Sequence, residues 1–143
     1  PRFIELAGQI NESMPKFVVD KVTDALNNDG KAVRNSRIHV LGVAYKRDVN
    51  DVRESPALHV IKMLLDKGAK VTYSDPYAPT IREEGMELAE VPVRQALEAG
   101  TDCVVLLTDH SCFNYPEIVH LAPMIVDTRN ALRDFIGGNI VRL

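Results

Sequence analysis

The sequence predicts an α/β protein built on a doubly wound parallel sheet with helices on both faces. Short apolar runs alternate with segments of helical periodicity along the 143-residue chain, and this alternation is typical of βαβ units. Most of the runs are apolar at successive positions, as expected for strands that are covered on both sides. The composition, 45% hydrophobic and 26% charged, is that of an ordinary globular protein, and the length supports about one core.

Residues 3–27 have helical periodicity, with apolar side chains three or four positions apart. Pro15 lies inside this segment, and a proline in a helix interior removes one backbone hydrogen bond. We therefore expect a break or kink near residues 11–14 and a second helix that ends at about Leu26. Because this helix precedes the βαβ pattern, we expect it to pack on the sheet as the end of a preceding region.

The remaining elements follow in order along the chain. Ser55 is a natural helix N-cap with Pro56 at the first helical position, and Gly68 is a natural C-terminal stop. The predicted strands are residues 37–44, 70–74, a short strand near Leu88, 102–108 and 124–127, with an edge strand in 138–143; the predicted helices are 55–67, 93–98 and 115–121.

Composition and charge exclude several classes of protein. Lys and Arg number 17 and Asp and Glu 20, so the net charge is −3, whereas a dedicated nucleic-acid binder normally has a basic excess. No apolar run approaches the roughly 18 residues of a membrane span, and no signal peptide is visible. No His, Cys and carboxylate cluster has metal-ligand spacing. We therefore expect neither a nucleic-acid partner, nor a membrane partner, nor a metal.

Cysteine usage is typical of the reducing cytoplasm. Cys103 lies in an apolar run and is expected to be buried, whereas Cys112 lies in a loop-like stretch and is expected to be more exposed. Two such residues do not make a disulfide framework. The chain starts at Pro1 without an initiator Met, which suggests a piece of something longer.

The richest candidate site is the loop after the first predicted strand, residues 42–56, because open α/β sheets bind ligands at the carboxyl ends of their strands. The dinucleotide fingerprint needs three glycines, and only Gly42 is present. This loop is therefore not expected to hold NAD in the usual way. Lys46 can instead supply a point charge to a phosphate.

A second interpretation of that loop stays open. Its cations can form solvated surface pairs with neighbouring acids: Lys46, Arg47 and Arg53 with Asp48, Asp51 and Glu54.

A second cation, Arg129, comes directly after a buried strand, and its fork of donors suits phosphate. In a sheet ordered 3-2-1-4-5, its loop neighbours residues 108–110, which in turn neighbour the first loop. Lys46 and Arg129 would then converge on one diphosphate. The alternative is that Arg129 pairs with Asp127 and caps the strand end.

Other candidates are weaker. His110 follows a strand and is a possible general base, but a histidine in a turn is more often exposed. Asp75 ends the second strand, where a Rossmann acid would bind ribose; without the glycines, a turn at Asp75-Pro76 is favoured. The other histidines are expected to pack or to lie at the surface: His39, His59 and His120.

Four motifs in order resemble one known family. The first loop is similar to the signature of the C-terminal domain of UDP-sugar and GDP-mannose dehydrogenases. The motifs, which span most of the chain, are Asn11-Glu12-Ser13-Met14-Pro15; Gly42-Val43-Ala44-Tyr45-Lys46 with Asp48, Asp51 and Arg53-Glu54-Ser55-Pro56; Leu107-Thr108-Asp109-His110-Ser111 with Phe113; and Val126-Asp127-Thr128-Arg129-Asn130.

The resemblance implies a cytoplasmic oxidoreductase of polysaccharide biosynthesis. Such NAD-dependent enzymes convert the C6 alcohol of a nucleotide sugar to a carboxylate by two hydride transfers, through a thiohemiacetal on a catalytic Cys. Their N-terminal domain binds NAD and supplies that Cys, and the C-terminal domain binds the nucleotide. By this resemblance, residues 1–30 are the end of a central helical dimerisation region, residues 31–143 bind the UDP-sugar, and the full-length protein is a homo-oligomer.

The resemblance also implies roles for single residues. Tyr45 and Lys46 would contact base, ribose and diphosphate, and Arg129 would hold the diphosphate or sugar side of the cleft. Arg53 would reach toward the NAD diphosphate across the domain interface. The supporting residues are Asp48, Asp51, Ser55 and Asn130.

The NAD fingerprint and the catalytic Cys motif are absent, and neither Cys103 nor Cys112 has a matching context. We therefore expect this chain alone, with no catalytic residue, to bind but not to oxidise. Within the family, residues 53–56 and 108–110 are most similar to the branch that acts on UDP-N-acetylhexosamines, mannosamine or glucosamine. Two alternatives are a free-standing flavodoxin-like regulatory or binding module and a structural dimerisation domain that uses helix 3–27.

Overall fold

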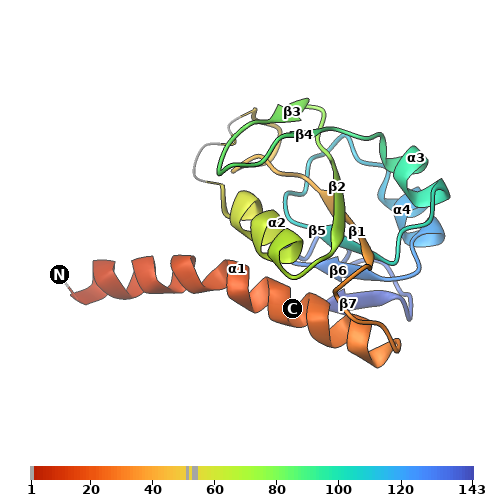
Figure 1. Ribbon diagram of the computed structural model, residues 1–143, viewed down its shortest axis with the longest axis horizontal. Coiled ribbons are helices and arrows are strands. Elements are labelled where there is room, and N and C mark those ends of the chain that lie inside the picture. The colour runs from red at the N-terminus through yellow and green to blue at the C-terminus, as the bar shows by residue number, and fades with distance from the viewer. Residues whose placement is uncertain (1, 51, 53–54) are drawn as a thin grey trace.

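A computed structural model describes residues 2–50, 52 and 55–143, with side chains from Met14 onward (Figure 1). None of the helices in this part of the chain is long and apolar enough to cross a membrane. The elements are α1 (Arg2–Asn28), β1 (Arg37–Leu41), α2 (Pro56–Asp66), β2 (Lys70–Ser74), β3 (Thr80–Ile81), β4 (Leu88–Ala89), α3 (Val93–Glu98), β5 (Cys103–Leu106), α4 (Tyr115–Leu121), β6 (Ile125–Asp127) and β7 (Ile140–Arg142).

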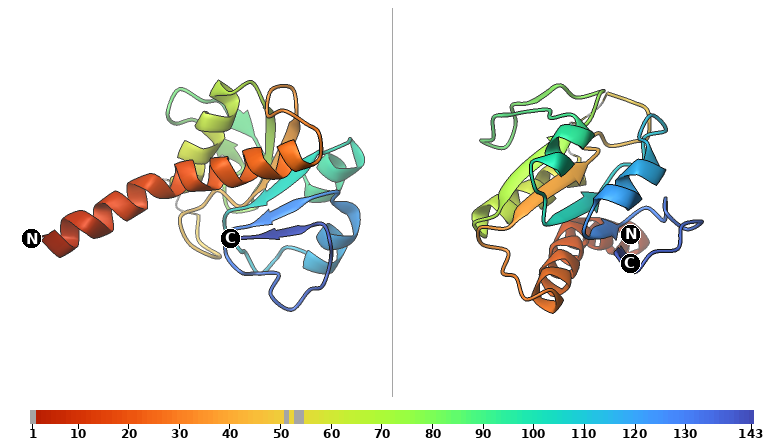
Figure 2. Two further views of the ribbon diagram at one scale, coloured as in Figure 1. Left: turned by 90° about the horizontal axis from the view of Figure 1, so that it is seen from below. Right: turned by 90° about the vertical axis from the view of Figure 1, so that its right-hand side faces the viewer.

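The predicted doubly wound α/β fold is confirmed. Five strands pair in parallel in the order β2-β1-β5-β6-β7. Helices α1 and α2 cover one face, and α3 and α4 cover the other (Figure 2). The chain adds β2 on one side of β1 and then adds β5, β6 and β7 on the other side, so the strand order reverses between β1 and β5. Sheets of this kind bind ligands in the crevice outside the carboxyl ends of these two strands.

The two cores explain the apolar runs of the strands. Along β5, Cys103 and Val105 pack on the α1 and α2 side, whereas Val104 and Leu106 pack on the α4 side. All four residues have no exposed surface, and each such aliphatic side chain contributes about 1.5–3 kcal/mol through burial. The expectation that β5 is covered on both faces is therefore confirmed.

The predicted break in the first helix is wrong. Helix α1 runs without interruption from Arg2 to Asn28 and includes Pro15. A proline costs the helix one backbone hydrogen bond, but the following turns bury Val18, Val22 and Leu26 completely against the sheet and α2. That burial offsets the lost bond. The N-terminal part of α1 extends beyond the sheet (Figure 1).

The strand predicted near Leu88 exists but does not join the main sheet, so the order 3-2-1-4-5 is wrong at its first position. Strands β3 and β4 form a separate antiparallel pair. Val91, in the segment after β4, donates its main-chain N–H to Tyr73 O at 2.8 Å, and this hydrogen bond lies at the outer edge of β2. Two residues are too few to extend a sheet. The predicted edge strand in the tail is confirmed as β7, beside β6.

Gly42 brings the end of β1 against the residues that follow β5. Its φ of +82° is in the left-handed region, and a Cβ built on it would lie 2.4 Å from the main-chain oxygen of Thr108 and 2.8 Å from its nitrogen. Thr108 Oγ1 also donates to Ala44 O at 2.6 Å. The close approach of these two loops therefore requires glycine at position 42.

His39 is a buried polar residue in the middle of β1. Its ring nitrogens lie 2.7 Å from Thr72 Oγ1 and 2.7 Å from Ser74 Oγ. Ser74 Oγ donates its hydrogen to Val91 O, so it accepts from Nε2, and Nδ1 accepts from Thr72. Burial lowers the pKa of His39 from 6.5 to about 4. The imidazole is therefore neutral and satisfied on both sides.

Stability should fall as the pH drops from about 6.5 to about 4. In that window the unfolded chain takes up a proton at residue 39 that the folded chain excludes, so the free energy of unfolding decreases by up to about 3 kcal/mol. Urea unfolding at several pH values measures this. In His39→Gln the decrease in that window should be clearly smaller, and an unchanged pH profile would contradict the account.

Gly42→Ala should destabilise the fold by more than about 2 kcal/mol, because the new Cβ meets rigid main-chain atoms and the φ angle is unfavourable. Gly138→Ala is the matched control, since a Cβ there meets nothing within 4 Å, and its effect should stay within about 0.5 kcal/mol. Thermal or urea unfolding gives both values. Equal effects of the two changes would show that the contact with Thr108 is unimportant.

Candidate functional site

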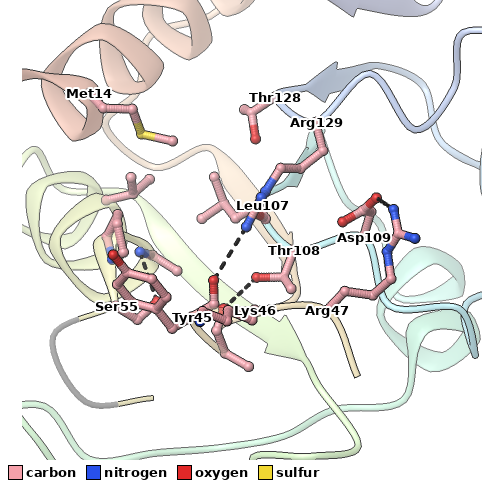
Figure 3. Close-up of a pocket in the computed structure, with 14 residues that line it drawn as sticks. Met14, Tyr45, Lys46, Arg47, Ser55, Leu107, Thr108, Asp109, Thr128 and Arg129 are labelled. Carbon is pink, nitrogen blue, oxygen red and sulfur yellow. Dashed lines mark hydrogen bonds and ion pairs between the residues drawn. The ribbon is translucent and has the colours of Figure 1, made fainter. Parts of the chain in front are cut away.

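A cavity of about 560 Å³ opens at the carboxyl edge of the sheet, at the point where the strand order reverses (Figure 3). The loops after β1, β5 and β6 surround it, together with the first turn of α2 and one residue of α1. Its volume is within the range of ordinary small-molecule sites. The lining residues are Met14, Ala44, Tyr45, Lys46, Arg47, Ser55, Pro56, Ala57, Val60, Leu107, Thr108, Asp109, Thr128 and Arg129.

Lys46 and Arg129, which are 83 positions apart in the sequence, both line this cavity. Arg129 Nε donates to Leu107 O at 2.8 Å, and its Nη2 donates to Tyr45 O at 3.4 Å (Figure 3). The guanidinium therefore reaches from the loop after β6, past β5, to the residue before Lys46. The two loops meet, as the sequence predicts.

Arg129 does not use Asp127 as the partner of its side chain. The Asp127 carboxylate accepts the main-chain N–H groups of Arg129, Ala131 and Leu132 at 3.0, 3.2 and 2.8 Å. The alternative in which the guanidinium pairs with Asp127 is therefore wrong. Asp127 instead shapes the turn, and within that turn Asn130 has a φ of +58°.

A third cation on the cavity, Arg47, is paired. Its guanidinium forms an ion pair with Asp109 of the loop after β5, and this hydrogen bond raises the pKa of Arg47. The described partner of Arg47 is therefore an acid of the neighbouring loop, whereas two acids of its own loop, Asp51 and Glu54, lie outside the described residues. Among the ion pairs of residues 2–50, 52 and 55–143, none includes Lys46 or Arg129.

Helix α2 begins at the cavity with its predicted cap. Ser55 Oγ accepts from Ala57 N–H at 3.2 Å, and Pro56 occupies the first helical position. Ser55 is buried, and this first turn lines the cavity. The partial positive charge of a helix N-terminus therefore adds to that of the two cations and favours an anion.

Asp48 lies at the end of the segment that carries Tyr45 and Lys46. It has a φ of +59°, and its carboxylate accepts from Ser111 N–H and Ser111 Oγ–H, each at 2.9 Å. These bonds lower the pKa of Asp48. Three further residues of this loop that the sequence singles out, Asp51, Arg53 and Glu54, lie outside the described residues.

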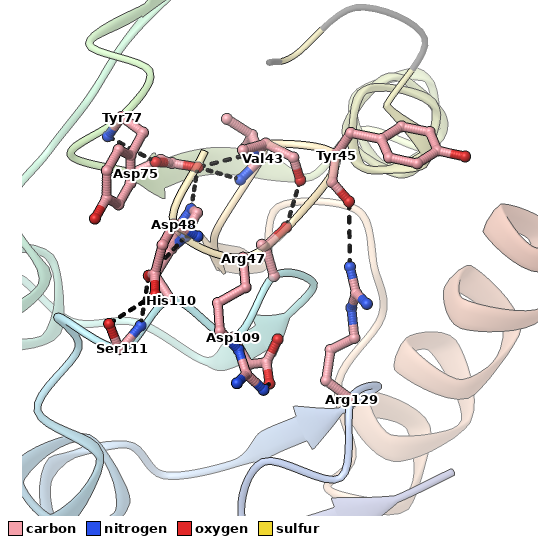
Figure 4. A network of polar contacts seen from close by, with 12 residues as sticks. Val43, Tyr45, Arg47, Asp48, Asp75, Tyr77, Asp109, His110, Ser111 and Arg129 are labelled. Carbon is pink, nitrogen blue, oxygen red and sulfur yellow. Dashed lines mark hydrogen bonds and ion pairs between the residues drawn. The ribbon is translucent and has the colours of Figure 1, made fainter. Parts of the chain in front are cut away.

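Sequence reasoning missed a buried polar pair beneath the first loop, Asp75 and His110 (Figure 4). Neither has any exposed surface, and His110 Nε2 lies 2.9 Å from Asp75 Oδ2. The expectation of an exposed His110 is therefore wrong, whereas the turn at Asp75 is confirmed, since Oδ1 accepts Tyr77 N–H at 2.9 Å. The available signal was position: the two residues end β2 and follow β5, the strands on either side of β1.

The cysteines lie as expected. Cys103 is buried, and Cys112 is exposed. Burial raises the pKa of Cys103 to about 12, so its thiol stays protonated at neutral pH. Within the described part of the chain, no three His, Cys, Asp or Glu side chains are grouped in a way that could hold a metal ion.

Known proteins resemble this chain over most of its length. It is 36% identical over 141 residues to a UDP-N-acetyl-D-mannosamine dehydrogenase of Methanococcus maripaludis, and 34% identical over 140 residues to a UDP-glucose 6-dehydrogenase of Rhizobium meliloti. Each match covers 92% of this chain, which spans about 31% of the length of either relative.

The structural comparison agrees. A UDP-D-ManNAc dehydrogenase from Pyrococcus horikoshii superposes with a TM-score of 0.81 at 28% identity, over 97% of this chain and 32% of the other. Residues 39–134 match the model of the UDP binding domain of the UDP-glucose/GDP-mannose dehydrogenase family, a segment that includes the loops after β1, β5 and β6. The chain belongs to the UDP-glucose/GDP-mannose dehydrogenase family.

Proposed function

We propose that this chain binds the UDP part of a nucleotide sugar on behalf of an NAD-dependent UDP-sugar 6-dehydrogenase. The observation that carries the proposal is the shared cavity of Lys46 and Arg129 at the switch point of the sheet. Residues 31–143 are then the nucleotide-binding domain, and residues 1–30 are the end of a central helical region.

In this proposal the diphosphate lies between the two cations. Lys46 supplies a point charge, and Arg129 supplies directed donors. Of the five N–H groups of a guanidinium, two are engaged by Leu107 O and Tyr45 O, and the other three have no partner among the described residues and are proposed to face phosphate oxygens. The carbonyl contacts also fix the plane of the guanidinium before ligand arrives.

The nucleoside would lie against Tyr45. Its side chain is on the cavity and its residue surface is 45% exposed, a high value for a tyrosine in a folded domain. An aromatic ring of this kind offers a flat apolar face with a polar tip to a base or ribose. Met14 of α1 gives the cavity an apolar wall, which extends the site beyond the sheet.

The residues of this chain do not fit a bound NAD pyrophosphate. The first loop has one glycine where the dinucleotide fingerprint has three, and the space beside Gly42 is filled by Thr108. NAD and the catalytic thiol are therefore assigned to an N-terminal domain of the full-length protein, with Arg53 reaching toward the cofactor. The present chain contributes binding energy from the non-reacting end of the substrate, which orients C6 for hydride transfer.

For the sugar, we propose an N-acetylhexosamine. The relatives named for UDP-N-acetyl-D-mannosamine support this, at 36% sequence identity and at a TM-score of 0.81. We also propose that the full-length enzyme is a cytoplasmic homo-oligomer. The N-terminal part of α1, which extends away from the sheet (Figure 2), supports a place for this helix at a subunit interface.

Calorimetric titration with UDP tests the site directly. The wild-type chain should bind UDP saturably, and Lys46→Ala or Arg129→Ala should each weaken binding by roughly ten- to a hundredfold, because a charge-assisted hydrogen bond is worth about 1.5–3 kcal/mol. Arg129→Lys should restore only part of the affinity, because an ammonium cannot form the forked contact.

The matched controls are Lys70→Ala at the opposite end of the sheet and Arg82→Ala beside β3, both exposed and off the cavity. Neither should change the affinity for UDP by more than about twofold. Equal losses in all four alanine variants would show a non-specific charge effect and would contradict the assigned site.

The chain alone should not reduce NAD with any UDP-sugar. The buried Cys103 is protonated and held in β5, and the loop after β1 lacks a dinucleotide cradle. Absorbance of NADH over time measures this, with a full-length family member as the positive control. A progress curve above the no-enzyme background would overturn the assignment of NAD binding and of the catalytic thiol to the N-terminal domain.

A further inference from the structure

The carboxylate of Asp75 accepts hydrogen bonds from three different segments of the chain. Oδ2 accepts from Val43 N–H at 2.8 Å, Ala44 N–H at 3.0 Å and His110 Nε2 at 2.9 Å (Figure 4). Oδ1 accepts from Tyr77 N–H at 2.9 Å. A fully buried carboxylate is stable only when it is surrounded by donors in this way. Asp75 therefore holds the beginning of the first loop to the end of β2.

The imidazole of His110 continues this contact to the other end of the same segment. Its Nδ1 accepts from Asp48 N–H at 2.8 Å. Val43 and Ala44 precede Tyr45 and Lys46, and Asp48 follows Arg47. The three residues that face the cavity are thus held at both ends by one buried carboxylate–imidazole pair.

The hydrogen bonds determine the protonation state of this imidazole. A main-chain N–H can only donate, so Nδ1 presents its lone pair to Asp48, and the proton is on Nε2, facing the carboxylate. The ring is neutral and satisfied at both nitrogens. Tyr77 and Phe113 pack on it with ring centroids at 4.8 and 5.6 Å, which prevents rotation.

Asp48 needs this contact because its conformation is unfavourable. A φ of +59° is costly for a residue other than glycine, although aspartate tolerates it better than most. Three bonds stabilise it: its N–H to His110 Nδ1, and its carboxylate to the N–H and the hydroxyl of Ser111. Residues 110 and 111 thus stabilise the turn that follows Arg47.

We propose that His110 is a positioning residue of the nucleotide site: together with Asp75 it sets the arc Tyr45-Lys46-Arg47 so that Lys46 meets the ligand beside Arg129. This inference rests on the proposed function. His110 itself does not line the cavity, so it acts through the arc and not by touching the ligand.

Two variants each remove one of the two hydrogen bonds of the His110 imidazole, the one to Asp75 or the one to Asp48 N–H. His110→Asn keeps an acceptor near Asp48 N–H but is too short for Asp75, and His110→Gln keeps a donor for Asp75 but loses the acceptor. Each should weaken UDP binding by about three- to thirtyfold, the effect of one or two hydrogen bonds. His120→Gln, an exposed histidine of α4, is the control and should leave the affinity unchanged.

A double-mutant cycle with Lys46→Ala gives the readout that a merely structural role would not move. If His110 acts through the arc, most of the affinity loss in His110→Asn should disappear when Lys46 is already alanine. An equal loss in both backgrounds would show general destabilisation and would overturn the proposal, as would unchanged binding in both His110 variants.

Amide hydrogen exchange distinguishes failure of this inference from failure of the proposed function. If the wild-type chain does not bind UDP, the proposed function is wrong. In either case, His110→Gln should lose exchange protection at residue 48, and His110→Asn, which frees Asp75, should lose it at residues 43 and 44, while both variants retain protection in β5 and β6. Uniform loss across the sheet, or no loss at the three amides, would overturn the role assigned to His110.

Discussion

The parallel order β2-β1-β5-β6 is the constraint on which the rest of this structure depends. It brings the ends of three strands to one edge of the sheet, so that loops far apart in the sequence share one cavity. Side chains then fix how the loops meet: Thr108 against Gly42, the guanidinium of Arg129 against Tyr45 O, and Asp75 against Val43 and Ala44. The strand order determines which loops are neighbours, and these side-chain contacts determine how far apart the loops lie.

Local chemistry made much of this fold predictable. Continuous apolar runs located the buried strands, and the serine–proline pair at the start of α2 located its cap. Lys46 and Arg129 could be assigned to one site because parallel strands end at the same edge. The errors arose where tertiary packing overrides local preference. Burial on the sheet carries α1 through Pro15, and the polarity of His110 gave no sign that Asp75 would reach it across β1.

The polar residues of this domain divide into two groups. His39, Asp75 and His110 are buried, and donors and acceptors match at each of them, so they hold the strands and loops in place. Lys46 and Arg129 are different: their described contacts include no carboxylate, and they face an open cavity beside a helix N-terminus. Positive charge that has no carboxylate partner among the described residues is suited to an anionic ligand, and this agrees with the match to a UDP binding domain.

The most direct test of the central claim is a crystal structure of this chain with UDP. The account predicts one diphosphate at the carboxyl edge of the sheet, with Lys46 Nζ and the Arg129 guanidinium both within hydrogen-bond distance of its oxygens and Tyr45 against the nucleoside. A nucleotide bound elsewhere, or one whose phosphates contact neither cation, would contradict it.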